Sequence, residues 1–359
     1  MRRPAMHCIG MDVHANVTMI SVRGPDGRVV ERRTVRGPLG HLAGSVRMLH
    51  EKYGPLRVCY EASTGAGWLH DRLRELGVQV RVAHPGKVRM IFRAKRKNDR
   101  IDADKLSFLA YLDEVPLAHI PPAERRRWRS LIEYRRRLVE RRGAVKNRTR
   151  TLLRSRGEVA PRGLWTKAGL AWLVALALSE EEALQRDLLL EELASLKDRI
   201  GRLEKHLAVL ASRQPAVGLL RTIPGVGIRT AEAVVAYVDD PHRFRRVKSV
   251  GCYFGVVPCE DTSVKTRYGH ITKEGPSTVR KYLTEATWQA IRKDATVRAY
   301  FERVARNDPD RRKIALVATA HHLLRVMLAM LRTGEAWRTA GSAPEAARNP
   351  AQDRTEAAA

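Results

Sequence analysis

The chain has 359 residues, with 67 Lys and Arg against 39 Asp and Glu, so its formal net charge is +28. A chain of this length is expected to form two or three domains. No apolar run approaches the roughly 18–20 residues that span a bilayer, and the first ten residues lack the apolar segment of a signal peptide. The four cysteines form no C-x-x-C pair, which favours the cytoplasm over secretion. Binding a polyanion would relieve the self-repulsion of so large a positive charge, and nucleic acid is the commonest polyanion in the cytoplasm.

Short apolar runs and helical patterns fill the first part of the chain. The first three runs predict a β-meander, because a Gly-Pro-Asp-Gly turn separates the second run from the third. The predicted strands are 7–13, 17–22, 29–35, 58–60 and 78–83, and the predicted helices are 39–53 and 65–76. Three strands followed by alternating helix and strand predict an α/β layer structure with a mixed sheet.

The middle of the chain is helical and strongly basic. Residues 124–158 hold fourteen Arg and Lys against four Glu, and predict a long cationic helix suited to a nucleic-acid backbone. From Leu189 to Leu210, leucines and one isoleucine recur in steps of four and three, which is the a/d pattern of a coiled coil. We expect this seam to join copies of the chain; the alternative is a helical hairpin within one chain.

Four carboxylates occupy positions from which they can converge. Asp12 lies late in the first strand and Glu61 ends the fourth, while Asp99 and Asp102 share one face of a helix start. Asp104, two residues on, is expected to point elsewhere. Each acid alone is more commonly a turn or helix cap. Together they favour a site for two Mg²⁺ ions, whose hard character suits carboxylate and phosphate oxygens.

Three motifs carry a resemblance to a known family: GMDVHAN at 10–16, YEAST at 60–64 and KNDRIDADKL at 97–106. They resemble the DEDD transposases of bacterial insertion sequences, often called the one-ten family. The resemblance implies an RNase H-like (RuvC-like) α/β domain, a long helical and coiled-coil region, and a mainly α-helical C-terminal domain. The family's metal-binding acids fall on Asp12, Glu61, Asp99 and Asp102. The expected parts are 1–115, 116–212 and 213–332, with a disordered tail at 333–359.

The C-terminal part begins with RTIPGVGIRTA at 221–231, which matches a helix-hairpin-helix. Gly225 and Gly227 would let the backbone approach a phosphate, and the following helix N-terminus would present free N–H groups to it. The alternative is a plain helical turn.

A polar, basic segment follows at 255–275, and spacing alone would make its Ser263 a capping or solvated residue. The resemblance changes that expectation. The family has a Gly-x-x-Pro segment, a serine five residues later that attacks DNA to form a phosphoserine link, and then Lys-x-Gly. The matching residues here are Gly255, Pro258, Ser263, Lys273 and Gly275. Val264 departs from the family, which usually has Gly after the serine. Thr262 and Ser277 are weaker rivals.

The sequence therefore predicts a site-specific DNA recombinase of an insertion sequence. The resemblance further implies a tetramer in which the metal site of one protomer meets the serine of another, and a bridge RNA that chooses the DNA sites. The expected nucleic-acid contacts are Arg96, Lys97, Arg100, Gly225, Gly227, Lys265, Arg267 and Lys273. Two rivals stay open: a junction nuclease that uses metal-activated water, and a nucleic-acid-binding protein without chemistry. No membrane partner is expected.

Overall fold

The computed structural model describes residues 6–92, 99–261 and 267–338. It divides into two compact units, 1–126 and 127–359. The division at 115 and 212 that the sequence suggests stays a prediction.

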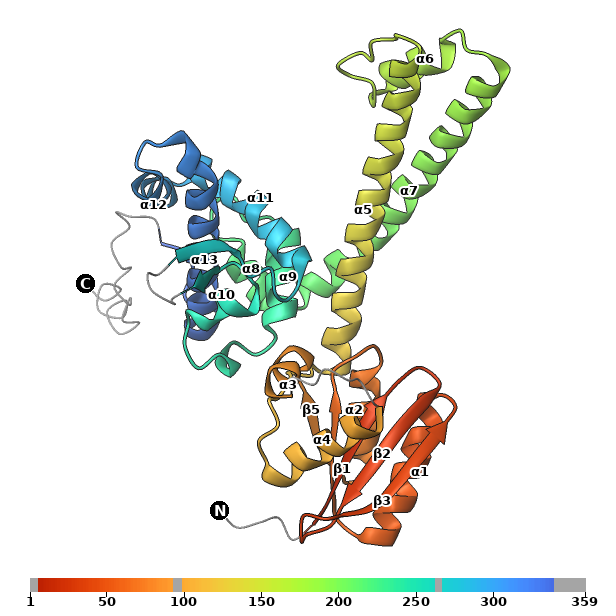
Figure 1. Ribbon diagram of the computed structural model, residues 1–359. Coiled ribbons are helices and arrows are strands. Elements are labelled where there is room, and N and C mark those ends of the chain that lie inside the picture. The colour runs from red at the N-terminus through yellow and green to blue at the C-terminus, as the bar shows by residue number, and fades with distance from the viewer. Residues whose placement is uncertain (1–5, 93–98, 262–266, 339–359) are drawn as a thin grey trace, which may run out of the picture. The chain divides into compact units, whose positions relative to one another are not determined.

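The first unit is built on a five-stranded mixed sheet with the order β3-β2-β1-β4-β5 (Figure 1). The strands are β1 (His7–Val13), β2 (Val17–Arg23), β3 (Val29–Arg36), β4 (Leu56–Glu61) and β5 (Gln79–Ala83). The first three are antiparallel, whereas β4 pairs in parallel with both β1 and β5. The predicted meander and mixed sheet are therefore confirmed, and they form the arrangement on which the resemblance to RNase H-like domains rests.

Helices cover both faces of this sheet, and successive residues of each strand face opposite sides of it. On one face, α1 (Leu39–Tyr53) and α2 (Ala66–Glu75) bury Ile9 and Met11 of β1 in an aliphatic core. On the other face, Cys8 and Cys59 pack with α4 (Asp99–Leu112) and with α3 (Pro85–Ile91). Because side chains alternate along a strand, Asp12 and Glu61 belong to the same face as these two cysteines.

The second unit contains an antiparallel helical hairpin made of α5 (Ala123–Ser155) and α7 (Glu180–Ser212), with α6 (Lys167–Ala175) between them. Ion pairs fix the antiparallel register, since positions rise along α5 as they fall along α7: Arg135–Glu204, Arg141–Glu192 and Arg156–Glu182. The a/d leucines of α7 pack on α5 of the same chain, in a cluster of Leu138, Val145, Leu189, Leu196 and Ile200. The structure therefore shows the alternative, a helical hairpin within one chain. The leucine seam of α7 packs on α5 without a second copy of the chain.

The rest of the second unit is a helical bundle around one large core. Its helices are α8 (Pro215–Leu220), α9 (Ile228–Val238), α10 (Ser249–Tyr253), α11 (Ser277–Lys293), α12 (Ala295–Ala305) and α13 (Arg312–Thr333). Two short 3₁₀ turns, η1 (Pro241–Arg243) and η2 (Pro309–Arg311), complete it. A β-hairpin of β6 (Pro258–Asp261) and β7 (Arg267–Ile271) also belongs to this unit. The sequence did not predict this hairpin.

Two features near the C-terminal end differ from expectation. The segment Pro309–Thr333 is long and apolar enough to span a bilayer by length and composition, although half of its most apolar window is buried in the bundle. The start of the predicted disordered tail is docked: the indole of Trp337 packs on the core, and its N–H donates to Asp294 at 3.0 Å.

Candidate active site

Asp12 and Glu61 lie together because their strands are neighbours and run parallel. The β1–β4 register pairs Met11 with Tyr60, so each carboxylate stands one residue beyond that pair, at the carboxyl end of its strand. The ends of adjacent parallel strands are where open α/β sheets commonly bind ligands.

Helix α4 brings Asp102 to the same place, and Gly10 allows it to do so. A Cβ at Gly10 would lie 2.0 Å from the carbonyl oxygen of Ala103, and 2.2 Å from the backbone nitrogen of Ser107. Only glycine permits so close a crossing of helix and strand. The glycine two residues before Asp12 is therefore what lets Asp102 approach it.

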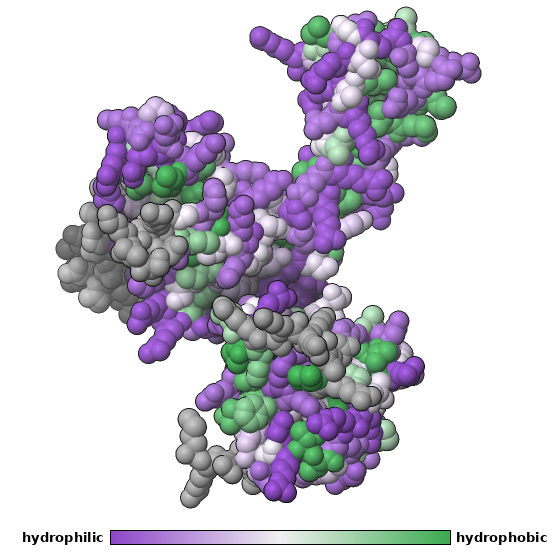
Figure 2. Space-filling view, in the orientation of Figure 1, coloured by the Kyte–Doolittle hydropathy of each residue, from purple (hydrophilic) through white to green (hydrophobic). Residues whose placement is uncertain are grey.

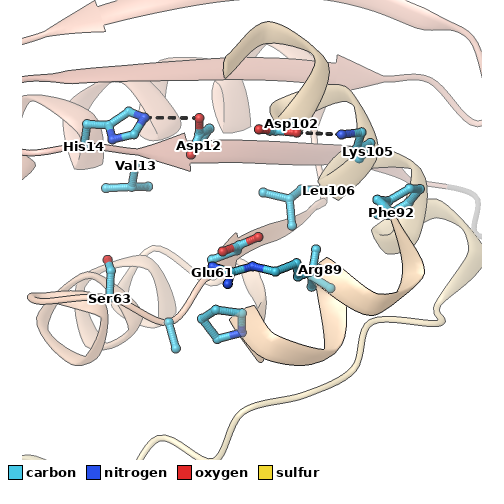
Figure 3. Close-up of a pocket in the computed structure, with 13 residues that line it drawn as sticks. Asp12, Val13, His14, Glu61, Ser63, Arg89, Phe92, Asp102, Lys105 and Leu106 are labelled. Carbon is cyan, nitrogen blue, oxygen red and sulfur yellow. Dashed lines mark hydrogen bonds and ion pairs between the residues drawn. The ribbon is translucent and has the colours of Figure 1, made fainter. Parts of the chain in front are cut away.

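The three carboxylates Asp12, Glu61 and Asp102 line one cavity of about 540 Å³ (Figure 3). Basic side chains enter the same space. His14 Nε2 lies 3.2 Å from Asp12 Oδ2, and Lys105 Nζ lies 2.7 Å from Asp102 Oδ1. Arg89 of α3 lines the cavity beside Glu61. Sequence analysis did not single out His14, Arg89 or Lys105 as partners of these acids, although His14 and Lys105 lie within the acidic motifs.

The donor set suits a hard divalent cation such as Mg²⁺, since every acidic group facing the cavity offers carboxylate oxygens. Within residues 6–92, 99–261 and 267–338, no three His, Cys, Asp or Glu side chains gather closely enough to hold an ion together. Asp99 is the first residue of α4, but its side chain is not described.

Asp104 points away from the cavity, as expected. Its carboxylate accepts hydrogen bonds from Arg32 on β3, with Arg32 Nη2 at 2.9 Å from Oδ2. Partial burial works to raise the pKa of Asp104, but hydrogen bonds from Arg32 and Ser21, together with the charges of Arg32 and Arg23, hold the pKa below its usual value. Asp104 is therefore committed to the fold.

The serine segment corresponds to the β6–β7 hairpin. Ser263, Val264 and Lys265 lie outside the described residues, between the two strands in sequence. Arg267 is the first residue of β7, and Lys273 follows the hairpin in a left-handed conformation with φ +55°. The sequence signal for the hairpin was the β-branched and aromatic residues that flank the polar stretch.

Two glycines of the family pattern close the base of this hairpin. A Cβ at Gly255 would lie 2.3 Å from the backbone of Glu274, and one at Gly275 would lie 2.0 Å from the carbonyl oxygen of Tyr253. Arg280 of α11 fastens the base further, because its Nη1 donates to the carbonyl oxygens of Phe254 and Gly275. Sequence analysis missed this role of Arg280.

The remaining predicted contacts are spread over both units. Gly225, with φ +93°, faces α11, since its Cβ would lie 2.4 Å from the backbone nitrogen of Ala290. Gly227 caps the N-terminus of α9 and has open space where a Cβ would lie. Gly225 is therefore packed against the protein itself, and phosphate contact at Gly227 stays a prediction. Arg96 and Lys97 lie outside the described residues; Arg100 lies in α4, without a described side chain.

Comparisons with known proteins cover most of the chain. A family model described as "Transposase", for the DEDD transposases of the IS110 group, matches residues 9–156. A second, "Transposase IS116/IS110/IS902 family", matches residues 217–302. The chain belongs to the IS110 family of DEDD transposases. The first match includes all residues that line the acidic cavity, and the second begins in α8. This transposase therefore carries the regions described by both family models in one chain. Its substrate is DNA.

Individual relatives agree with this assignment. The transposase is 27% identical to the "Transposase for insertion sequence element IS1111A" of Coxiella burnetii, over 92% of this chain and 91% of that protein. It is 28% identical to a "Probable family 20 transposase" of Pseudomonas aeruginosa, over 79% of this chain and 84% of that protein. A Thermus thermophilus RuvC structure aligns with 32% of this chain and all of its own, at 16% identity and a TM-score of 0.24.

Proposed function

We propose that this transposase cuts and rejoins DNA through Ser263, assisted by two Mg²⁺ ions held by Asp12, Glu61, Asp99 and Asp102. The serine oxygen would form a bond to phosphorus as the bond between phosphorus and one of the strand's own oxygens breaks. The serine hydroxyl would lose its proton and the released DNA oxygen would take one up to leave as a hydroxyl. The new phosphoserine diester would allow the reverse reaction to rejoin a strand. Bound Mg²⁺ would supply charge stabilisation at the attacked phosphate. Lys265, Arg267 and Lys273 would neutralise the negative charge that develops there, or contact phosphates without catalysis.

One observation carries this proposal: Asp12, Glu61 and Asp102 come from separate segments of the chain and line a single cavity. A helix cap has no need of such a meeting, because a cap bonds to the backbone of its own helix.

The acids are tested with a matched pair of variants. Asp12→Asn should abolish cleavage of element-end DNA while leaving DNA binding intact, and EDTA should do the same to the unmodified protein. Asp104→Asn is the control, because this carboxylate bonds Arg32 and faces away from the cavity. Full cleavage by Asp12→Asn, or in EDTA, would contradict the metal site.

The serine is tested by trapping a covalent product. Denaturing electrophoresis of a reaction with labelled DNA should show a protein–DNA adduct, and Ser263→Ala should remove both adduct and strand exchange. Ser277→Ala is the control, since Ser277 begins α11 and is a weaker rival for the nucleophile. Cleavage without any adduct would favour the junction nuclease, and Mg²⁺-independent binding without cleavage would favour the non-catalytic alternative.

The proposal extends to partners. We propose that a bridge RNA selects the DNA sites. We further propose that the acids of one protomer meet the serine of another in a dimer or tetramer, and that the protein acts in the cytoplasm. Mixing Asp12→Asn with Ser263→Ala protein tests this arrangement, because a site shared between protomers regains activity in the mixture. Sequencing RNA that copurifies with the protein tests the guide.

A further inference from the structure

The basic side chains of α5 differ in their partners within the chain. Several form ion pairs inside the chain, and these hold the hairpin or neutralise nearby acids. Their pairs are Arg135–Glu204, Arg136–Glu133, Arg136–Glu140, Arg137–Glu133, Arg141–Glu192 and Arg156–Glu182. These cations already pair with carboxylates of the chain, and they would have to leave those partners to bind a polyanion.

Four other basic residues of α5 have no carboxylate partner among the described residues. Arg142, Lys146, Arg150 and Arg154 recur at every fourth position of α5, and we call them the cationic row. None of the four is paired with a carboxylate in the described parts of the chain, where Arg150 bonds only the side-chain oxygen of Asn147, at 3.2 Å. Successive members of an i, i+4 ridge are ~6 Å apart along the helix axis, so the row extends ~18 Å.

Trp165 anchors the middle of the row. Lys146 Nζ lies 4.9 Å from the centre of the indole ring, and Arg150 Cζ lies 5.5 Å from it. These cation–π contacts hold two like charges in fixed positions on the protein surface. Burial, together with the neighbouring Arg142 and Arg150, lowers the pKa of Lys146 below its usual value. An anion brought to the row would relieve that repulsion.

The surroundings of the row suit a polyanion. The hairpin arm carries mostly hydrophilic side chains (Figure 2), and Arg150 and Arg154 border a hollow of about 300 Å³ next to the end of α5. Glu158 also lines this hollow, but no ion pair joins it to either arginine among the described residues. The row is thus a line of positive charge whose counter-ions come from outside the chain.

We propose that the cationic row binds the sugar–phosphate backbone of duplex DNA during transposition. A duplex presents one negative charge per ~1.7 Å of its axis, so a stiff row of anchored cations faces several phosphates at once. Single-stranded nucleic acid is disfavoured, because binding it depends on aromatic faces open to stacking, and cations already lie over the ring of Trp165. The inference rests on this transposase acting on DNA and is independent of Ser263 and of metal ions.

The test is the salt dependence of binding, measured by fluorescence anisotropy on duplex DNA in EDTA, so that no cleavage is needed. The row variant combines Arg142→Gln, Lys146→Gln, Arg150→Gln and Arg154→Gln. The control variant combines Lys197→Gln, Arg199→Gln, Lys205→Gln and Arg213→Gln, which removes the same charge from exposed positions on and just after α7. Circular dichroism checks that both variants fold.

Each phosphate neutralised contributes about 0.9 to the slope of log affinity against log salt, so the row variant should lose up to about 3.6 from that slope. The control variant should lose less than about 1. Equal losses in the two variants would reduce the row to part of the general positive charge and overturn the proposal. A loss seen with duplex RNA but not with duplex DNA would also overturn it, in favour of an RNA site.

Discussion

Glu232 in α9 is a carboxyl group without exposed surface, and its two oxygens have different surroundings. Oε1 accepts a hydrogen bond from Arg229 Nη1 at 2.8 Å, whereas the buried Oε2 has no hydrogen-bond partner in the described chain. Burial raises the pKa of Glu232 to about 7, against the opposing charges of Arg229 and Arg135. The folded chain therefore holds this proton more tightly than the unfolded chain does.

The consequence for stability follows from the sign of that difference. The ordinary pKa is 4.5 and the folded pKa is about 7. The stability associated with Glu232 is then fully present below pH 4.5 and is lost as the pH rises through 7. At about 1.4 kcal/mol per pH unit, the ionised folded chain is less stable by about 3 kcal/mol above pH 8.

Glu232→Gln stays neutral at every pH and keeps an oxygen for Arg229. We expect the variant and the unmodified protein to be about equally stable at pH 4.5, and the variant to be more stable by up to about 3 kcal/mol at pH 8.5. Urea unfolding followed by circular dichroism at several pH values measures the difference in free energy of unfolding between the two proteins. Groups that titrate alike in both proteins contribute nothing to this difference. Glu285→Gln, at an exposed position of α11, is the control. A difference between variant and unmodified protein that does not change with pH would refute the reasoning.

Three further outcomes are expected. Gly10→Ala should abolish cleavage and cost about 1–3 kcal/mol, because the added methyl group meets the backbone of α4; cleavage assays and urea unfolding measure the two effects. Trp337→Phe should lower stability by about 1–3 kcal/mol in urea unfolding, because buried Asp294 loses its indole donor. Glu31 is bonded by Lys52 and has a pKa lowered to about 2, so its stabilisation is lost as the pH falls from 4.5 towards 2. Thus Glu31→Gln should destabilise the protein at pH 7 by about 1 kcal/mol, and by less at pH 3, in the same assay.

The sheet and its acids could be predicted because their signals are local. Strand alternation places Asp12 and Glu61 on one face, and strand ends place them on one edge. The approach of Asp102 could not be predicted this way. It depends on Gly10 meeting Ala103, ninety-three positions later, and a sequence shows the glycine but not what comes close to it.

The leucine seam of α7 shows a different limit. An a/d pattern states that a helix packs on another helix, and the packing of knobs into holes is the same whether the partner belongs to the same chain or to a second copy. The sign of the charges distinguishes the two cases better. Arg135 and Arg141 on α5 stand opposite Glu204 and Glu192 on α7, in antiparallel register, which a careful pairing of the two helices could have found.

The β6–β7 hairpin gives a structural reason for two glycines of the C-terminal motif. Backbone hydrogen bonds join Thr272 to Val257 and Lys273 to Gly255, so the residues before β6 and after β7 are held side by side. A one-residue insertion or deletion within β6 or β7 would shift the register of the strands and turn the side chains beyond it to the other face. Glycine is required at Gly255 and Gly275 because the hairpin base is too close to its neighbours for a side chain. The glycines and these backbone hydrogen bonds therefore hold the two strands together at their base.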